Sequence, residues 1–312
     1  MQGRWQLGNI LGIPFYLDRS WFAIAALLTW SNGALLNQLF FRQGSPWLGF
    51  LLGFVLALLL FASVLLHELG HSLVARYQGI RVNSITLFLF GGVAAIEREP
   101  ATPEGALAVA LAGPAVSLAL WFLCQSGTWL PGAGVGRFML ADVGRLNLFL
   151  ALFNLLPGLP LDGGQALKAI VWKLKGGAQK GQEARLTATR WAARSGQFFG
   201  ALGIGAGLIL VFLAGEGSGL WLSLIGWFVW RNAQRYDQLS ALQLILQTLT
   251  AGDAVNRQFR VVSAELTLAE FAQTYLLDSA DNWFTPYYCA SDGRYRGLIP
   301  VYLLRDIERS DW

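Results

Sequence analysis

The stretch FASVLLHELGHSLVARYQG, residues 61–79, decides the fold, because a compact group of ionisable residues ends a long apolar run. Residues 44–66 form 23 consecutive positions without a charged side chain. At about 1.5 Å per helical residue, such a run crosses a bilayer core of about 30 Å. The group His67-Glu68-Leu69-Gly70-His71 therefore lies inside or just beneath the lipid. Ionisable side chains are expensive there, and they indicate function.

The composition is that of a membrane protein followed by a smaller, more polar part. Of the 312 residues, 54% are hydrophobic and 13% are charged, and the mean hydropathy is +0.46. The two cysteines lie far apart, so the sequence supports neither a disulfide framework nor a cysteine metal site. The net charge is +4, but the basic residues cluster beside apolar segments rather than in one aromatic-rich patch. We interpret them as topology signals and expect no nucleic-acid partner.

Long uncharged runs predict an α-helical polytopic membrane protein with about six transmembrane helices. The expected spans are residues 20–41, 47–77, 105–125, 146–161, 198–214 and 219–230. With this assignment, fourteen Lys and Arg residues fall on the side of the N-terminus and three fall on the other side. The positive-inside rule then places both termini in the cytoplasm. His67 and Asp162 come to lie at similar depth on the cytoplasmic side.

Residues 85–96 predict a membrane-associated β-hairpin. Two β-prone runs flank Gly91-Gly92, and this glycine pair supplies the positive φ of a tight turn. An apolar hairpin with an open edge is costly in lipid unless protein or a ligand covers it. Two interpretations stay open. The hairpin is either a buried strand pair without a further role, or a substrate-binding edge that uses Phe88, Phe90, Gly91 and Gly92.

The spacing of the two histidines predicts a metal site. In a helix, His67 and His71 project from one face, so both imidazoles can bind one zinc ion. Glu68 lies beside them without being forced to ligate, as a general base near the metal requires. The alternative is a pair of ordinary helix histidines. These are the only two histidines in the chain and both lie at membrane depth, so we expect one zinc ion per chain.

A catalytic zinc needs a third protein ligand, and Asp162 is the candidate. It is the only acid between Asp142 and Glu183, and it follows sixteen uncharged residues. The preceding Pro157 and Pro160 break the helix, so that backbone can approach the site. The alternative is an ordinary Asp-Gly-Gly turn at the membrane surface. A lone acid opposite two histidines favours the ligand.

Two motifs together resemble a known family. HELGH on one transmembrane helix and N-x-x-P-x-x-P-L-D-G-G (residues 154–164) on a later one resemble the site-2 proteases, which are intramembrane zinc metalloproteases. The resemblance covers about residues 1–235, and it implies that His67, His71 and Asp162 hold zinc while Glu68 is the catalytic base. It also likens Gly91-Gly92 to the family's membrane-dipping hairpin and residues 112–114 to its third-helix motif. Where many relatives carry Asn, this chain has Ser117, which leaves a polar contact from that position in doubt.

The expected chemistry is cleavage of a peptide bond within a transmembrane segment. Glu68 would take a proton from the attacking water and pass it to the leaving amine. Asn154 is a candidate donor to the oxyanion, or else a polar contact between helices. The substrate, a single-span protein in the lipid bilayer, must unwind first, because a helix hides its carbonyls in its own hydrogen bonds. The hairpin edge would then capture it by β-addition.

Residues 236–312 predict a small cytoplasmic α/β module. The order is helix, strand, helix, strand, strand, helix, with Asp292-Gly293 as the turn between residues 285–291 and 296–301, and a last helix at 302–308. The pattern resembles a single CBS repeat. This resemblance implies an adenine nucleotide as a candidate ligand and a homodimer as a candidate assembly. A docking domain without a ligand stays an equally open interpretation.

The sequence thus predicts an intramembrane zinc endopeptidase in a bacterial inner membrane. Such an enzyme serves regulated intramembrane proteolysis, for example the release of a membrane-tethered regulator. The main alternative is a membrane zinc carrier or transporter, which would also place His and Asp at membrane depth. It is disfavoured for two reasons. The outer halves of the second and fourth spans are apolar, and a transporter rarely needs an unligated glutamate, such as Glu68, beside its metal ligands. A catalytically dead binder is disfavoured because Glu68 is intact.

Overall fold

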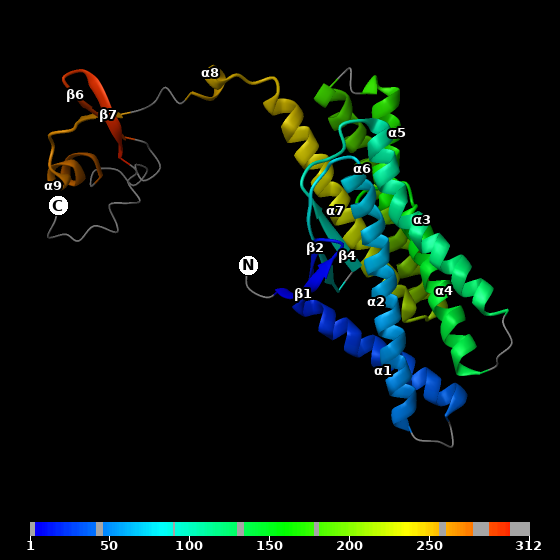
Figure 1. Cartoon of the computed structure of the whole chain (residues 1–312). Coiled ribbons are helices and arrows are strands. Elements are labelled where there is room, and N and C mark those ends of the chain that lie inside the picture. Colours follow the sequence, from blue (N-terminus) through cyan, green and yellow to red (C-terminus); the bar gives the residue numbers. More distant parts are fainter. Residues whose placement is uncertain are drawn as a thin grey trace. The chain divides into compact units, whose positions relative to one another are not determined.

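The chain divides into two compact units, residues Met1–Leu246 and Gln247–Trp312, which are described separately. The computed structural model describes residues 4–41, 46–89, 91–129, 134–177, 181–255, 260–276 and 287–299. Figure 1 shows the helices and strands of the chain.

The first unit is mostly helical. Its helices are α1 (Arg19–Phe40), α2 (Pro46–Tyr77), α3 (Pro103–Gly127), α4 (Val135–Asn154), α5 (Asp162–Leu174), α6 (Gly181–Ala214) and α7 (Ser218–Leu246). Helices α1, α2 and α3 follow the first three predicted spans. The predicted fourth span, 146–161, is wrong in its bounds, because α4 begins earlier and ends at Asn154. The polar connection after residue 168 is largely helical, so that α6 begins well before the predicted fifth span, and α7 extends well beyond the predicted sixth. Among the described helices, α2, α3 and α6 are long and apolar enough to cross a membrane.

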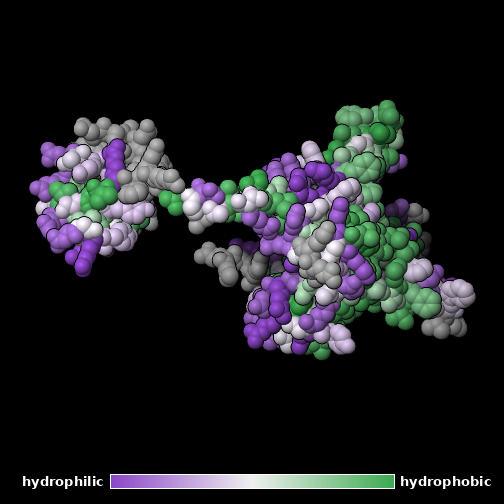
Figure 2. Space-filling view, turned by 90° about the horizontal axis from the view of Figure 1, so that it is seen from above, coloured by the Kyte–Doolittle hydropathy of each residue, from purple (hydrophilic) through white to green (hydrophobic). Residues whose placement is uncertain are grey.

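The surface of these helices is apolar where a soluble protein would be polar. Phe149 on α4 and Phe212 on α6 are 64% and 79% exposed. Figure 2 shows continuous areas of hydrophobic residues, in green, on the surface of the helical unit. Exposed apolar area of this extent indicates contact with lipid or with another protein.

A four-stranded sheet accompanies the helices. It consists of β1 (Arg4–Ile10), β2 (Ile13–Asp18), β3 (Val82–Phe88) and β4 (Gly91–Ile96), in that spatial order. The hairpin expected from the sequence is β3 and β4, paired antiparallel. The predicted place of its turn is wrong, because Gly91 pairs with Phe88 and Gly92 pairs with Leu87, so the glycines begin β4. Gly91 nevertheless has a φ of 134°. The expected extended N-terminal segment forms β1 and β2, and β2 pairs parallel with β3. Within the described residues β4 therefore has a neighbour on one side only.

One core cluster holds this sheet against the helices. Alternate residues of β2 and β3, such as Phe15 and Ile85, bury their side chains against Ala25 of α1 and Phe61 of α2. The first turn of α1 adds a polar contact, because the backbone N–H of Leu89 donates to Ser20 Oγ at 3.1 Å. The sheet is thereby fixed beside the half of α2 that carries the two histidines.

The second unit contains a small three-stranded sheet. Its described elements are α8 (Ala251–Ala254), β5 (Arg260–Ser263), α9 (Leu268–Phe271), the π-helix η2 (Ala272–Leu276), β6 (Tyr287–Ser291) and β7 (Arg294–Ile299). Strand β6 pairs parallel with β5 and antiparallel with β7. Asp292 and Gly293 form the turn with positive φ, as the sequence predicts. The last predicted helix, residues 302–308, lies outside the described residues.

Candidate metal centre

Helix α2 carries the two histidines on one buried face. His67 is 3% exposed and His71 is 8% exposed, and their Nε2 atoms lie 3.3 Å apart. The helical spacing of four residues produces this convergence, because side chains at i and i+4 share a face. Glu68, the next residue after His67, lines the adjoining cavity together with His71.

Asp162 reaches the two imidazoles from α5. Its Oδ2 lies 3.0 Å from His67 Nε2 and 3.3 Å from His71 Nε2. The chain after α4 turns through Pro157 and Pro160 before α5 begins at Asp162 itself. The carboxylate therefore lies at a helix N-terminus, where the free N–H groups and the helix dipole stabilise negative charge.

The geometry of the three ligand atoms fits a zinc ion. His67, His71 and Asp162 form a group whose ligand atoms all lie within 4.8 Å of one another. In a tetrahedral site with bonds of about 2.0–2.1 Å, neighbouring ligand atoms are separated by roughly 3.3 Å. The observed separations of 3.0, 3.3 and 3.3 Å match this value. Two nitrogens and one carboxylate oxygen are also ligands that zinc accepts.

Helix α3 orients both imidazoles from behind. His67 Nδ1 lies 2.9 Å from Ser117 Oγ, and His71 Nδ1 lies 2.7 Å from the backbone carbonyl of Val109. With Nδ1 engaged as a donor, each ring presents its unprotonated Nε2 toward Asp162. The polar contact that the sequence left in doubt at Ser117 is therefore present. Ser117 is fully buried.

Between these two contacts α3 presents Gly113 to the ligand atoms. A Cβ at this position would lie 2.2 Å from His71 Nε2 and 2.6 Å from His67 Nε2. Real Cβ atoms do not approach so closely. The face of α3 formed by Val109, Gly113 and Ser117 therefore acts as a cradle with space for an ion but none for a side chain. In the sequence, this glycine is recognisable only as part of the third-helix motif, residues 112–114.

The remaining predicted site residues lie at different distances from this centre. Strand β4 runs along it: a Cβ on Gly92 would lie 2.5 Å from Glu68 Cγ, and the Glu68 carboxyl is within hydrogen-bonding reach of the Ala94 backbone. Gly91 begins the same strand, whereas Phe88 lies on the inner strand β3 opposite Gly91. Phe90 lies outside the described residues. Asn154 ends α4 and is absent from the described lining of the cavity.

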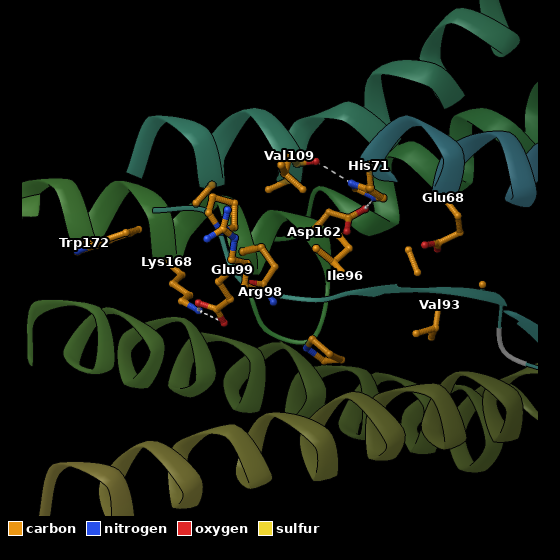
Figure 3. Close-up of a pocket in the computed structure, with 17 residues that line it drawn as sticks. Glu68, His71, Val93, Ile96, Arg98, Glu99, Val109, Asp162, Lys168 and Trp172 are labelled. Atoms are coloured by element: carbon orange, nitrogen blue, oxygen red, sulfur yellow. Dashed lines mark hydrogen bonds and ion pairs between the residues drawn. The ribbon is translucent and has the colours of Figure 1, made fainter. Parts of the chain in front are cut away.

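A cavity of about 370 Å³ extends from the metal centre between β4, α3 and α5. Figure 3 shows Glu68, His71 and Asp162 at one end and Lys168, Glu99 and Trp172 at the other. Val93, Ile96 and Arg98 also line it. The cavity thus offers a passage beside the edge of β4 that ends at a carboxylate and at the three convergent ligand atoms.

A buried His-His-Asp group with a neighbouring carboxylate, held by helices with apolar surfaces, is typical of a membrane metallohydrolase. Comparison with known proteins gives the family. The sequence model of peptidase family M50 matches residues 55–132 and 132–193 of this chain. "Putative zinc metalloprotease sll0528" of Synechocystis sp. is 42% identical over 316 residues, which cover 100% of this chain and 80% of that protein.

Two further similarities agree. "Putative zinc metalloprotease Rip3" of Mycobacterium tuberculosis is 35% identical over 312 residues, covering 97% of this chain and 76% of that protein. The solved site-2 protease from Methanocaldococcus jannaschii is 30% identical with a TM-score of 0.52, covering 75% of this chain and 95% of that one. The chain belongs to peptidase family M50, the site-2 proteases, and is a membrane zinc metalloprotease.

The cradle on α3 predicts that Gly113→Ala weakens metal binding while the helices still assemble. The added methyl group would occupy the space next to both Nε2 atoms, so we expect zinc affinity to fall at least about tenfold. The measurement is zinc per chain by mass spectrometry after equilibration with graded chelator. Gly205→Ala on α6 is the matched control, because a Cβ there meets nothing within 4 Å. Wild-type zinc affinity in Gly113→Ala would contradict the cradle.

Proposed function

We propose that this chain is an intramembrane endopeptidase that cleaves transmembrane segments of single-span, membrane-anchored proteins. His67, His71 and Asp162 would hold the zinc ion, and Glu68 would be the catalytic base. The observation that carries this proposal is the convergence of the three ligand atoms beside Glu68 at the end of one cavity.

The chain's own residues supply most of the chemistry. His67, His71 and Asp162 would hold a zinc ion, which would lower the pKa of a bound water and polarise the carbonyl of the peptide bond. Glu68 takes a proton from the attacking water, and it returns this proton to the amine nitrogen as the C–N bond breaks. Val109 and Ser117 keep both imidazoles in the orientation that ligation requires. Asn154 keeps its proposed role as a hydrogen-bond donor to the oxyanion.

The edge of β4 is the proposed substrate-binding element. A transmembrane helix must unwind before its carbonyls become accessible, and an unwound segment needs partners for its backbone groups in an apolar surrounding. A free strand edge offers these partners by β-addition. Support comes from the sheet order, which leaves β4 without a second neighbour among the described residues, and from Gly92 against Glu68. Phe88, on the inner strand, would act through the β3–β4 turn.

The arrangement in the membrane follows from charge. We propose six spans with both termini in the cytoplasm of a bacterial inner membrane, so that the site faces the cytoplasm. Residues 1–235 would form the protease domain, and residues 236–312 a CBS-like module with an adenine nucleotide as candidate ligand and homodimerisation as candidate assembly. The described order of β5, α9, β6 and β7 supports this module. Regulated release of a membrane-tethered protein is the proposed role.

The catalytic role of Glu68 predicts that Glu68→Gln abolishes cleavage but retains zinc. Loss of a general base lowers the rate by about 10²–10⁴-fold, while the three ligands are unchanged. The measurement is cleavage of co-expressed single-span substrates, with zinc content determined on the same preparations. Glu216→Gln, between α6 and α7, is the charge-matched control and should cleave normally. Cleavage that persists in Glu68→Gln would reject the mechanism, and zinc flux by a wild-type protein that cleaves nothing would indicate a carrier.

The β4 edge predicts a strand-like contact pattern with substrate. In a Glu68→Gln background with Cys124 and Cys289 replaced by Ser, Val93→Cys provides a single thiol on a residue that is 53% exposed. Substrates with one cysteine at successive positions should form disulfides at every second position, because neighbouring strand residues alternate in direction. Phe149→Cys, on α4, is the control and should not crosslink. A period of three to four positions, or no crosslink from Val93→Cys, would contradict β-addition.

A further inference from the structure

Glu99 connects three elements at the far end of the cavity. It lies in the segment that joins β4 to α3, and both its carboxylate oxygens accept from Lys168 Nζ of α5 at 2.8 Å. From α6, Arg185 Nε donates to Glu99 Oε2 at 2.7 Å, and Arg185 Nη2 donates to the same oxygen. The Arg185 guanidinium also lies 5.3 Å from the ring centre of Trp172 on α5. One carboxylate thus binds the end of β4 to two helices.

The contacts join a half-exposed carboxylate, Glu99, to the buried ammonium of Lys168 and the partly exposed guanidinium of Arg185. Lys168 is only 8% exposed, so its ammonium depends on Glu99 for compensation of its charge. Burial would raise the pKa of Glu99, but the nearby Lys168 and Arg185 outweigh it and hold this pKa below the usual value. The contribution of Glu99 to stability is therefore complete above its unfolded-state pKa and is lost as the pH falls through the lowered folded-state value. At neutral pH the contacts are intact.

The position of these contacts relates them to the metal centre. Helix α5 begins with Asp162, and Lys168 lies on the same helix; β4 ends at Ile96, and Glu99 follows shortly after it. Glu99 and Lys168 line the same cavity as Glu68 and His71, as Figure 3 shows. The Glu99–Lys168 pair is therefore a short cross-link between the strand beside Glu68 and the helix that carries Asp162.

We propose that Glu99 is a positioning residue for substrate, which sets the distance between the edge of β4 and Asp162 through its contacts with Lys168 and Arg185. It acts through β4 and does not touch the reacting atoms. The inference rests on the proposed function, in which the β4 edge holds the unwound substrate segment. An edge contact of this kind persists from the bound substrate to the transition state. Loosening it should therefore raise KM and leave kcat unchanged.

The test compares cleavage kinetics of a purified single-span substrate in detergent by wild type and Glu99→Gln. We expect Glu99→Gln to raise KM about tenfold and to keep kcat within about twofold. The matched control is Glu104→Gln, which removes an exposed ion pair of 2.9 Å between α3 and Lys173 of α5. Both side chains of that pair are exposed, whereas Glu99 pairs with the buried Lys168, so loss of the Glu104 pair should change neither parameter.

Two further variants separate positioning from folding. Glu99→Gln leaves the buried Lys168 ammonium without its partner, whereas Glu99→Gln/Lys168→Met removes both charges and should keep the wild-type melting temperature with the same raised KM. Glu99→Asp retains the charge and should recover most of the substrate affinity. A wild-type KM in the double variant, or a fall in kcat with lost zinc in Glu99→Gln, would overturn the proposal. Cleavage that survives Glu68→Gln would instead refute the proposed function.

Discussion

The packing of α3 against the histidine face of α2 is the contact on which the metal centre depends. An imidazole in an apolar surrounding cannot leave Nδ1 unpaired without cost, and α3 provides one acceptor for each ring. The same face has no side chain at Gly113, so the two rings and Asp162 can converge. Orientation and space thus come from one helix that contributes no ligand of its own. The ligands determine which metal can bind, while the contacts and the space provided by α3 determine whether the ligand atoms can converge.

The histidine pair and Asp162 could be predicted because rarity is itself a signal in an apolar chain. Two histidines in the whole sequence, and a lone acid after a long uncharged run, leave few alternative ligands. The bounds of α1, α2 and α3 were predictable because the length of an apolar run fixes them. The predicted bounds were wrong where apolar and polar residues adjoin, because α4, α6 and α7 extend into the polar stretches beside their apolar runs.

Other features could not be predicted because they depend on pairs of segments distant in the chain. Nothing in the N-terminal residues indicates a parallel pairing of β2 with β3. Ser117 stands where the resemblance leads one to expect Asn. Its hydroxyl still contacts His67 Nδ1, because α3 lies close to α2 at this depth. Glu99 resembles any charged loop residue in sequence. Its partners on α5 and α6 become apparent only once the connection after β4 is placed between those helices.

The parallel pairing of β2 with β3 has a mechanical consequence. Asp18 caps α1 and accepts from Ser20, whose hydroxyl in turn accepts from Leu89 in the turn before β4. The first turn of α1 and the β3–β4 turn are therefore joined directly by a hydrogen bond. A helix in a bilayer changes its tilt as the thickness of the hydrocarbon core changes. If α1 spans the bilayer, as the proposed six-span arrangement has it, a change in its tilt would reach the β3–β4 turn through Ser20 and Leu89. The lipid around α1 would then enter the geometry of the edge beside Glu68.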